Sequence, residues 1–164
     1  MIDLMKVTLT HEAAAAHWGR ADVTFQGDVA CIHLIEGDAL LHVQQAARKL
    51  ELQGVTQVAL TGALWTLDLQ WAFAQGFATA MTKPVIHWTG DDATQALLTS
   101  RLESATFARQ LINETPENLS PVVLATQAAK WLSAIGGDKV SYRIIEGEEL
   151  LEKKWIGIHA VGRG

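Results

Sequence analysis

Apolar and polar positions alternate with a period of two near the start of the chain, which is typical of β-strands. Residues 5–9 show this alternation and predict a half-buried strand. Two more strands are predicted at 23–25 and 29–35, joined by a tight turn in which Gly27 can adopt a positive φ. The intervening segment 11–17 is expected to form a helical turn or a loop. The pattern therefore predicts a strand followed by a β-hairpin.

From residue 38 the apolar period lengthens to that of an amphipathic helix. A helix is predicted at 39–53, with Asp38 as its N-cap and Gly54 closing its C-terminus. Its predicted buried face consists of Leu40, Val43, Ala47 and Leu50. The next segment, 55–60, is apolar with little alternation and predicts a strand covered on both faces.

A second helix and a further strand follow. Asp68 is the predicted N-cap of this helix, and the strand is predicted at 84–88 with proline at its start. The predicted inner face of the helix consists of Leu69, Phe73, Gly76 and Ala80. Strands alternating with helices indicate a mixed α/β sheet with right-handed crossovers.

A long third helix is predicted at 91–113, where Asp92 and Gln95 match a capping-box variant. Its apolar face consists of Leu98, Leu102, Ala105, Ala108 and Ile112. Pro116 disfavours helical geometry in the preceding residue, so a boundary is placed just after this helix.

The last part of the chain predicts two helices and two strands. Ser120, followed by proline, caps a helix that the glycines at 136–137 end. The predicted inner face of this helix consists of Leu124, Ala128, Trp131 and Ile135. A strand is expected at 140–144, a short helix at 147–155 and the start of another strand at 158–161.

These elements predict an α/β fold in three parts: an N-terminal domain at 1–88 with a mixed sheet flanked by helices, a connecting helix at 89–113, and the beginning of a second α/β domain at 114–164. Because the last predicted strand leads directly into Gly162-Arg163-Gly164, we expect the sequence to continue in the natural protein.

Composition narrows the class of protein. Apolar residues make up 49% of the chain and charged residues 19%, which excludes intrinsic disorder. The longest apolar stretch, 67–81, is broken by Asp68, Gln70 and Gln75, and no secretory signal is present, so a cytoplasmic protein without a membrane partner is expected. Cys31 is expected to be a buried thiol. A net charge of −5 without any Lys/Arg cluster argues against nucleic-acid binding.

We assign no catalytic, metal-ligating or cofactor-binding residue. The six histidines are His11, His17, His33, His42, His87 and His159, and they lack metal-ligand spacing. Of these, His33 and His87 are interpreted as structural because they lie in predicted strands. The paired carboxylates are Asp91 with Asp92, Glu114 with Glu117, and Glu148 with Glu149; capping, a solvated loop and a helical first turn explain them.

The six tryptophans divide into two groups. Trp71, Trp88 and Trp131 lie on predicted helices or a strand, and packing explains them. Trp18, Trp65 and Trp155 lie near loops or element ends and are the better candidates for contact with a ligand or partner.

The segments FARQLINETPENLSP and KVSYRIIEGEELLEKKWIGIHAVGRG resemble the opening of the catalytic domain in the leucyl aminopeptidase (cytosol aminopeptidase) family. The residues that match the family pattern, in order, are Arg109, Leu111, Asn113, Pro116, Asn118 and Pro121. The upstream segments AARKLELQGV and WAFAQGF extend the resemblance over essentially the whole chain.

The resemblance implies a cytosolic, homohexameric enzyme that removes N-terminal residues from peptides with two divalent metals, manganese or zinc. The family's metal ligands lie in a VGKG-type turn with an FDSGG-like segment and in an NTDAEGR-like segment, which this sequence lacks. Arg163 matches an earlier VGxG turn, and a guanidinium does not ligate metal. The chain is therefore expected to be a non-catalytic N-terminal portion that serves assembly and active-site access, with its own catalytic domain as partner.

One alternative from another class is a self-contained module that binds a small or nucleotide-like ligand. The loop Thr61-Gly62-Ala63 follows a predicted strand, and ligands of α/β sheets bind at strand ends. The loop lacks a second glycine, and no acidic ribose partner can be assigned by spacing.

Overall fold

The structure is a computed structural model that describes residues 4–34, 37–79 and 84–161. The chain forms two compact units, residues 1–110 and 111–164, which are described separately. The domain limits at 88 and 113 stay a prediction.

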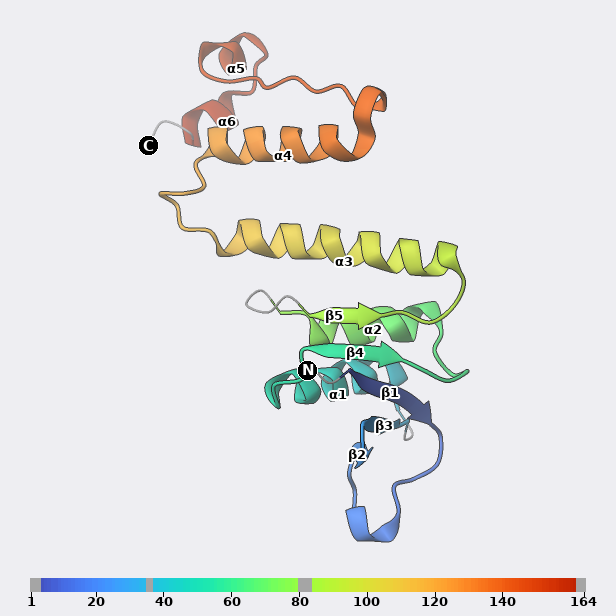
Figure 1. Cartoon of the computed structure of the whole chain (residues 1–164). Helices are drawn as coiled ribbons and strands as arrows, with labels where there is room; N and C mark the ends of the chain where they lie inside the picture. Colours follow the sequence, from blue (N-terminus) through green and yellow to red (C-terminus); the bar gives the residue numbers. More distant parts are fainter. Residues whose placement is uncertain (1–3, 35–36, 80–83, 162–164) are drawn as a thin grey trace. The chain divides into compact units, whose positions relative to one another are not determined.

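Unit 1 contains a five-stranded mixed sheet in the order β2-β3-β1-β4-β5 (Figure 1). The strands are β1 (Met5–Thr10), β2 (Val23–Gln26), β3 (Val29–His33), β4 (Gln57–Leu60) and β5 (Val85–His87). β2 pairs antiparallel with β3, and the other neighbouring pairs are parallel. Gly27 turns the β2–β3 hairpin with φ 60°. The α/β class, the mixed sheet and the hairpin are confirmed; Ile35, the last residue of the predicted third strand, lies outside the described residues.

Two helices, α1 (Ala39–Leu52) and α2 (Leu67–Phe77), pack against each other. They approach so closely that a Cβ added to Gly76 would lie 2.0 Å from the carbonyl oxygen of Gln44. Asp38 caps α1, as predicted, by accepting bonds from the N–H groups of the second and third helical residues. The cap predicted for α2 is wrong. Thr66 accepts from the Leu69 N–H, and Asp68 lies within the first turn, where its charge complements the helix dipole.

The core of unit 1 lies on one face of the sheet, beneath α1 and α2. It contains Val7, Leu9, Ala30, Ile32, Val43, Ala47, Leu50, Val58, Leu60, Leu69, Phe73 and Phe77, among other buried residues. Leu40 is an error in the predicted α1 face, because it is 45% exposed. Ala80, predicted for the inner face of α2, lies outside the described residues.

The opposite face of the sheet is partly open, which corrects two expectations. In β4, Val58 and Leu60 are buried but Gln57 and Ala59 are only partly buried, so this strand is not covered on both faces. Cys31 lies on the same side as Thr8 and Thr24 and is only partly buried. The thiol was predicted to be buried because sequence alone did not show that the helices α1 and α2 cover one face of the sheet.

The long helix α3 (Asp92–Asn113) confirms the third predicted helix. Its cap lies one residue earlier than predicted, because Asp91 Oδ1 accepts from the Thr94 N–H at 2.8 Å. The side-chain amide of Gln95 donates to the Gly90 carbonyl instead of closing a box with Asp92. Of the residues described in α3, Leu98 is the buried one; Ile112 is 80% exposed.

Unit 2 is helical in its described residues: α4 (Pro121–Gly136), a short 3₁₀ turn (Gly137–Lys139), α5 (Glu148–Glu152) and α6 (Ile156–Val161). Ser120 caps α4 as predicted. The predicted strand at 140–144 is wrong, since this segment has no paired strand among the described residues, and 158–161 lies in α6. An alternating pattern becomes a strand only when a neighbouring strand satisfies its backbone groups.

Candidate functional site

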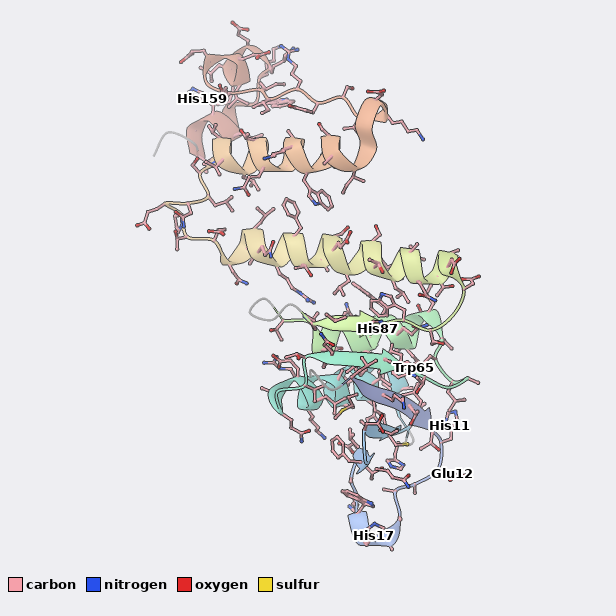
Figure 2. All side chains as sticks on the ribbon, viewed as in Figure 1. His11, Glu12, His17, Trp65, His87 and His159 are labelled. Atoms are coloured by element: carbon pink, nitrogen blue, oxygen red, sulfur yellow. The ribbon has the colours of Figure 1, made fainter. Side chains whose placement is uncertain are left out.

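Trp65 occupies the most conventional ligand position of the sheet. After β1 the chain continues toward the β2 edge of the sheet, and after β4 it continues toward the β5 edge. Ligands commonly bind where neighbouring strands connect in opposite directions in this way. There the Trp65 indole N–H lies 3.3 Å from the Val7 carbonyl oxygen and 3.1 Å from that of Thr61 (Figure 2). The side chain is 8% exposed and packs edge-to-face on Phe73. Trp65 was thus wrongly predicted as a contact residue, and its burial disfavours a ligand at Thr61-Gly62-Ala63.

The other tryptophans divide by exposure. Trp18 and Trp155 are 41% and 47% exposed, so both are accessible to a partner. Trp88 is partly buried and donates its indole N–H to the Thr99 hydroxyl at 3.0 Å, which ties β5 to α3. Trp71 and Trp131 are partly buried in their helices.

His33 has a structural position, as predicted. Its Nδ1 lies 2.7 Å from the Glu12 carbonyl oxygen, and its Nε2 lies 2.8 Å from the Thr24 hydroxyl. Because a carbonyl only accepts, Nδ1 carries a proton and donates to Glu12, and the Thr24 hydroxyl, which can donate or accept, bonds to Nε2. These bonds join the loop after β1 to the hairpin and occupy both ring nitrogens. His87 differs, since its residue is exposed.

A charged cluster that the sequence did not reveal joins α1 to the residue before β2. Lys49 forms an ion pair with Asp22, and the His42 Nε2 lies 3.8 Å from the other Asp22 oxygen. The hydrogen bond from Lys49 is the main cause that lowers the pKa of Asp22 below its ordinary value; partial burial opposes this shift, and the charges of Lys49 and His42 add to it. His42 and Lys49 are seven residues apart on one helix face, but nothing in the sequence placed Asp22 beside them.

The carboxylate pairs have structural roles or lie in solvent. A hydrogen bond from Thr94 lowers the pKa of Asp91, which caps α3. Glu149 forms an ion pair with Arg143 in the first turn of α5. Glu114 and Glu117 are exposed.

The described residues do not fit the metal pair that the family resemblance implies. Across 4–34, 37–79 and 84–161, no group of three or more His, Cys, Asp or Glu side chains is placed to hold a metal ion. Arg163, which stands in the VGxG-like turn, lies outside these residues. A dinuclear centre requires several such ligands, so no catalytic step is derived through metals in this chain.

Two cavities differ sharply in chemistry. The cavity in unit 2 has a volume of about 720 Å³ and a mainly apolar lining that includes Val122, Ala125, Ile144, Ile145, Ile158 and Val161. The cavity in unit 1 has a volume of about 480 Å³ and is lined mostly by polar side chains of α1, of the C-terminal end of α2 and of α3. Among the helices in the described part of the chain, none is long and apolar enough to cross a membrane.

Residues 6–92, which lie within unit 1, match the model of the family DUF3663, described as a peptidase. The match covers more than half of the chain, which therefore belongs to this family. The chain is also similar over its whole length to peptidase B of Cronobacter sakazakii and of Klebsiella pneumoniae, with 40% identity in each case and 39% of each relative covered. Peptidase B of Vibrio parahaemolyticus is 39% identical over 98% of this chain and 38% of the relative.

The chain spans about two fifths of the length of these relatives and is homologous to the N-terminal part of peptidase B. The resemblance to an aminopeptidase drawn from the sequence is thereby confirmed at the level of family.

Proposed function

We propose that this chain is the non-catalytic N-terminal portion of a peptidase B-like aminopeptidase. In this proposal the whole protein removes N-terminal residues from peptides with two divalent metal ions, manganese or zinc, and works as a cytoplasmic homohexamer. The similarity to peptidase B along the entire chain carries the proposal, together with the fraction of those relatives that it covers.

The proposed role is assembly and control of access to the catalytic domain. The absence of a metal-holding group among the described residues supports a non-catalytic role. The apolar cavity of unit 2 and its exposed neighbours, such as Ile156 and Ile158, support contact with further protein, because soluble proteins rarely leave such surfaces uncovered.

The first test is activity of the purified chain with leucyl and aspartyl chromogenic substrates in manganese or zinc. No turnover is expected, and calorimetry with manganese should give no saturable isotherm in the low micromolar range. Hydrolytic activity that co-purifies with the chain during metal-affinity chromatography would contradict the proposal.

The second test is a chimera in which this chain replaces the matching part of Cronobacter sakazakii peptidase B. The chimera is expected to hydrolyse the leucyl substrate and to elute as a hexamer. A chimera that folds by circular dichroism but stays monomeric and inactive would contradict the assembly role. Native peptidase B is the control.

A further inference from the structure

The cavity of unit 1 has cationic and amide side chains in its lining, which is a composition suited to an anion. Its volume of about 480 Å³ lies in the range of small-molecule pockets. Among the described residues, the charged side chains of its lining are Arg48 from α1 and Arg109 from α3, with no carboxylate beside them in the lining. Gln44, Gln45 and Gln75 add side-chain amides, so the walls are rich in hydrogen-bond donors. This contrasts with the chain as a whole, whose net charge is −5.

The close contact of α1 and α2 gives this cavity a firm base. Gly76 is buried and lies against the backbone of Gln44, so the two helices cannot slide together or apart without a clash or a gap. Ala78, 3% exposed, continues the lining past the end of α2. A site built on packed helices holds its polar groups more firmly than one on loops.

Arg109 is held in place by a hydrogen bond in which its Nη1 donates to the Ala78 carbonyl at 2.8 Å. This bond offsets part of the negative charge at the C-terminal end of α2, which would otherwise oppose an anion. A guanidinium has five N–H donors in a planar fork, so a bond from one of its nitrogens positions the group while other donors can bind a carboxylate or phosphate.

Arg48 is the second cation. It pairs with Glu51 at 2.6 Å, but the arginine side chain is 49% exposed and the pair lies within one helix. The Glu51 side chain is only 12% exposed, so this ion pair is kept, and the remaining N–H donors of Arg48 are available to an anion.

From these observations we infer that the cavity between α1, the C-terminal end of α2 and α3 binds a small multivalent anion through Arg48 and Arg109. The ligand class is a di- or tricarboxylate or a phosphate group, since two guanidinium groups match two or more negative charges. This inference does not depend on the proposed aminopeptidase function.

The test titrates citrate and inorganic phosphate separately into the full 164-residue chain, by calorimetry and by amide NMR shifts, at constant ionic strength with sodium chloride as reference. At least one anion should bind saturably and shift amides of α1 and of the α2 C-terminus. Arg48→Gln, which keeps the Ala78 bond, and Arg109→Gln should each weaken binding about tenfold or more. Arg101→Gln, on an exposed position of α3, is the matched control and should bind as the parent does.

The absence of saturable binding of either anion to the folded parent chain overturns the inference. Equal weakening by Arg101→Gln overturns it too, because that result indicates nonspecific charge attraction. If Arg109→Gln fails to fold, Arg48→Gln decides alone: unchanged binding in this variant contradicts the site.

Discussion

Both units of this chain are rich in apolar residues but use them differently. In unit 1, Phe73 and Phe77 are fully buried between the sheet and the helices. In unit 2, α4 buries Ala129 alone, whereas Ile135 is 67% exposed. The comparison teaches that an apolar helix face becomes a core only where another element lies against it. In unit 1, helices and a sheet cover each other's apolar faces, whereas the described helices of unit 2 leave most of theirs exposed.

The largest expected effect on stability comes from truncating a side chain in the buried core of unit 1. Phe73→Ala removes a fully buried ring that contacts Trp65 and Phe77, and should lower the free energy of unfolding by about 3–5 kcal/mol. Ile135→Ala, in α4, should change it by less than about 0.5 kcal/mol. Urea denaturation followed by circular dichroism measures both. Similar losses in the two variants would erase the contrast between the units.

The next effect concerns the contact of α1 with α2. Gly76→Ala places a Cβ 2.0 Å from the Gln44 carbonyl oxygen, so the helices must separate at a cost of about 1–3 kcal/mol. Gly157→Ala, in α6, is the matched control because nothing lies within 4 Å of its added Cβ. That variant should be neutral or gain up to about 1 kcal/mol from helix propensity. Thermal unfolding of both variants checks this, and a neutral Gly76→Ala would show that the helices are less tightly packed.

A smaller effect compares the two helix caps. Asp38→Ala removes the acceptor for two N–H groups of α1 and should cost about 1 kcal/mol, because α1 is part of the core. Ser120→Ala removes the same kind of cap from α4 but should leave the main unfolding transition unchanged. The urea midpoints of the two variants test the contrast; a large shift for Ser120→Ala would mean that α4 unfolds together with unit 1.

The smallest effect is a pH dependence from the Asp22 and Lys49 pair. The pKa of Asp22 is lowered in the folded chain, so the pair adds stability above the unfolded value of about 3.9, and this is lost as pH falls through the lower folded value. The contribution should stay below about 1 kcal/mol, since the pair is partly solvated. Lys49→Met should therefore be less stable than the parent chain at pH 6, with the difference shrinking below pH 4. Lys130→Met, on α4, serves as control, and a difference that grows toward low pH would contradict the sign.

The local signals in unit 1 made most of its fold predictable. The alternation of apolar and polar residues located the strands. Asp38 and Gly27 correctly indicated a helix cap and a turn, because both features depend only on backbone groups close in the sequence. The errors arose where distant contacts decide. Leu40 has the right spacing for the core but lies beyond the reach of the sheet, and Trp65 lies near a loop yet is buried by bonds to β1.

Unit 2 shows the converse limit. Residues 140–144 alternate as a strand does, but pairing requires another strand, and none lies beside them among the described residues. The candidate anion site was equally beyond the sequence, because Arg48 and Arg109 are brought together by the packing of three helices. The two arginines lie far apart in the sequence and belong to no motif that would have linked them.

Hydrogen exchange by mass spectrometry, with light scattering on the same sample, tests the central contrast most directly. We expect strong protection in β1, β3, α1 and α2, weak protection across residues 140–161, and self-association that covers exposed apolar residues such as Ile158. Strong protection across 140–161 in a strictly monomeric sample would contradict the account, because it would show that unit 2 is stable without further protein against its apolar surface.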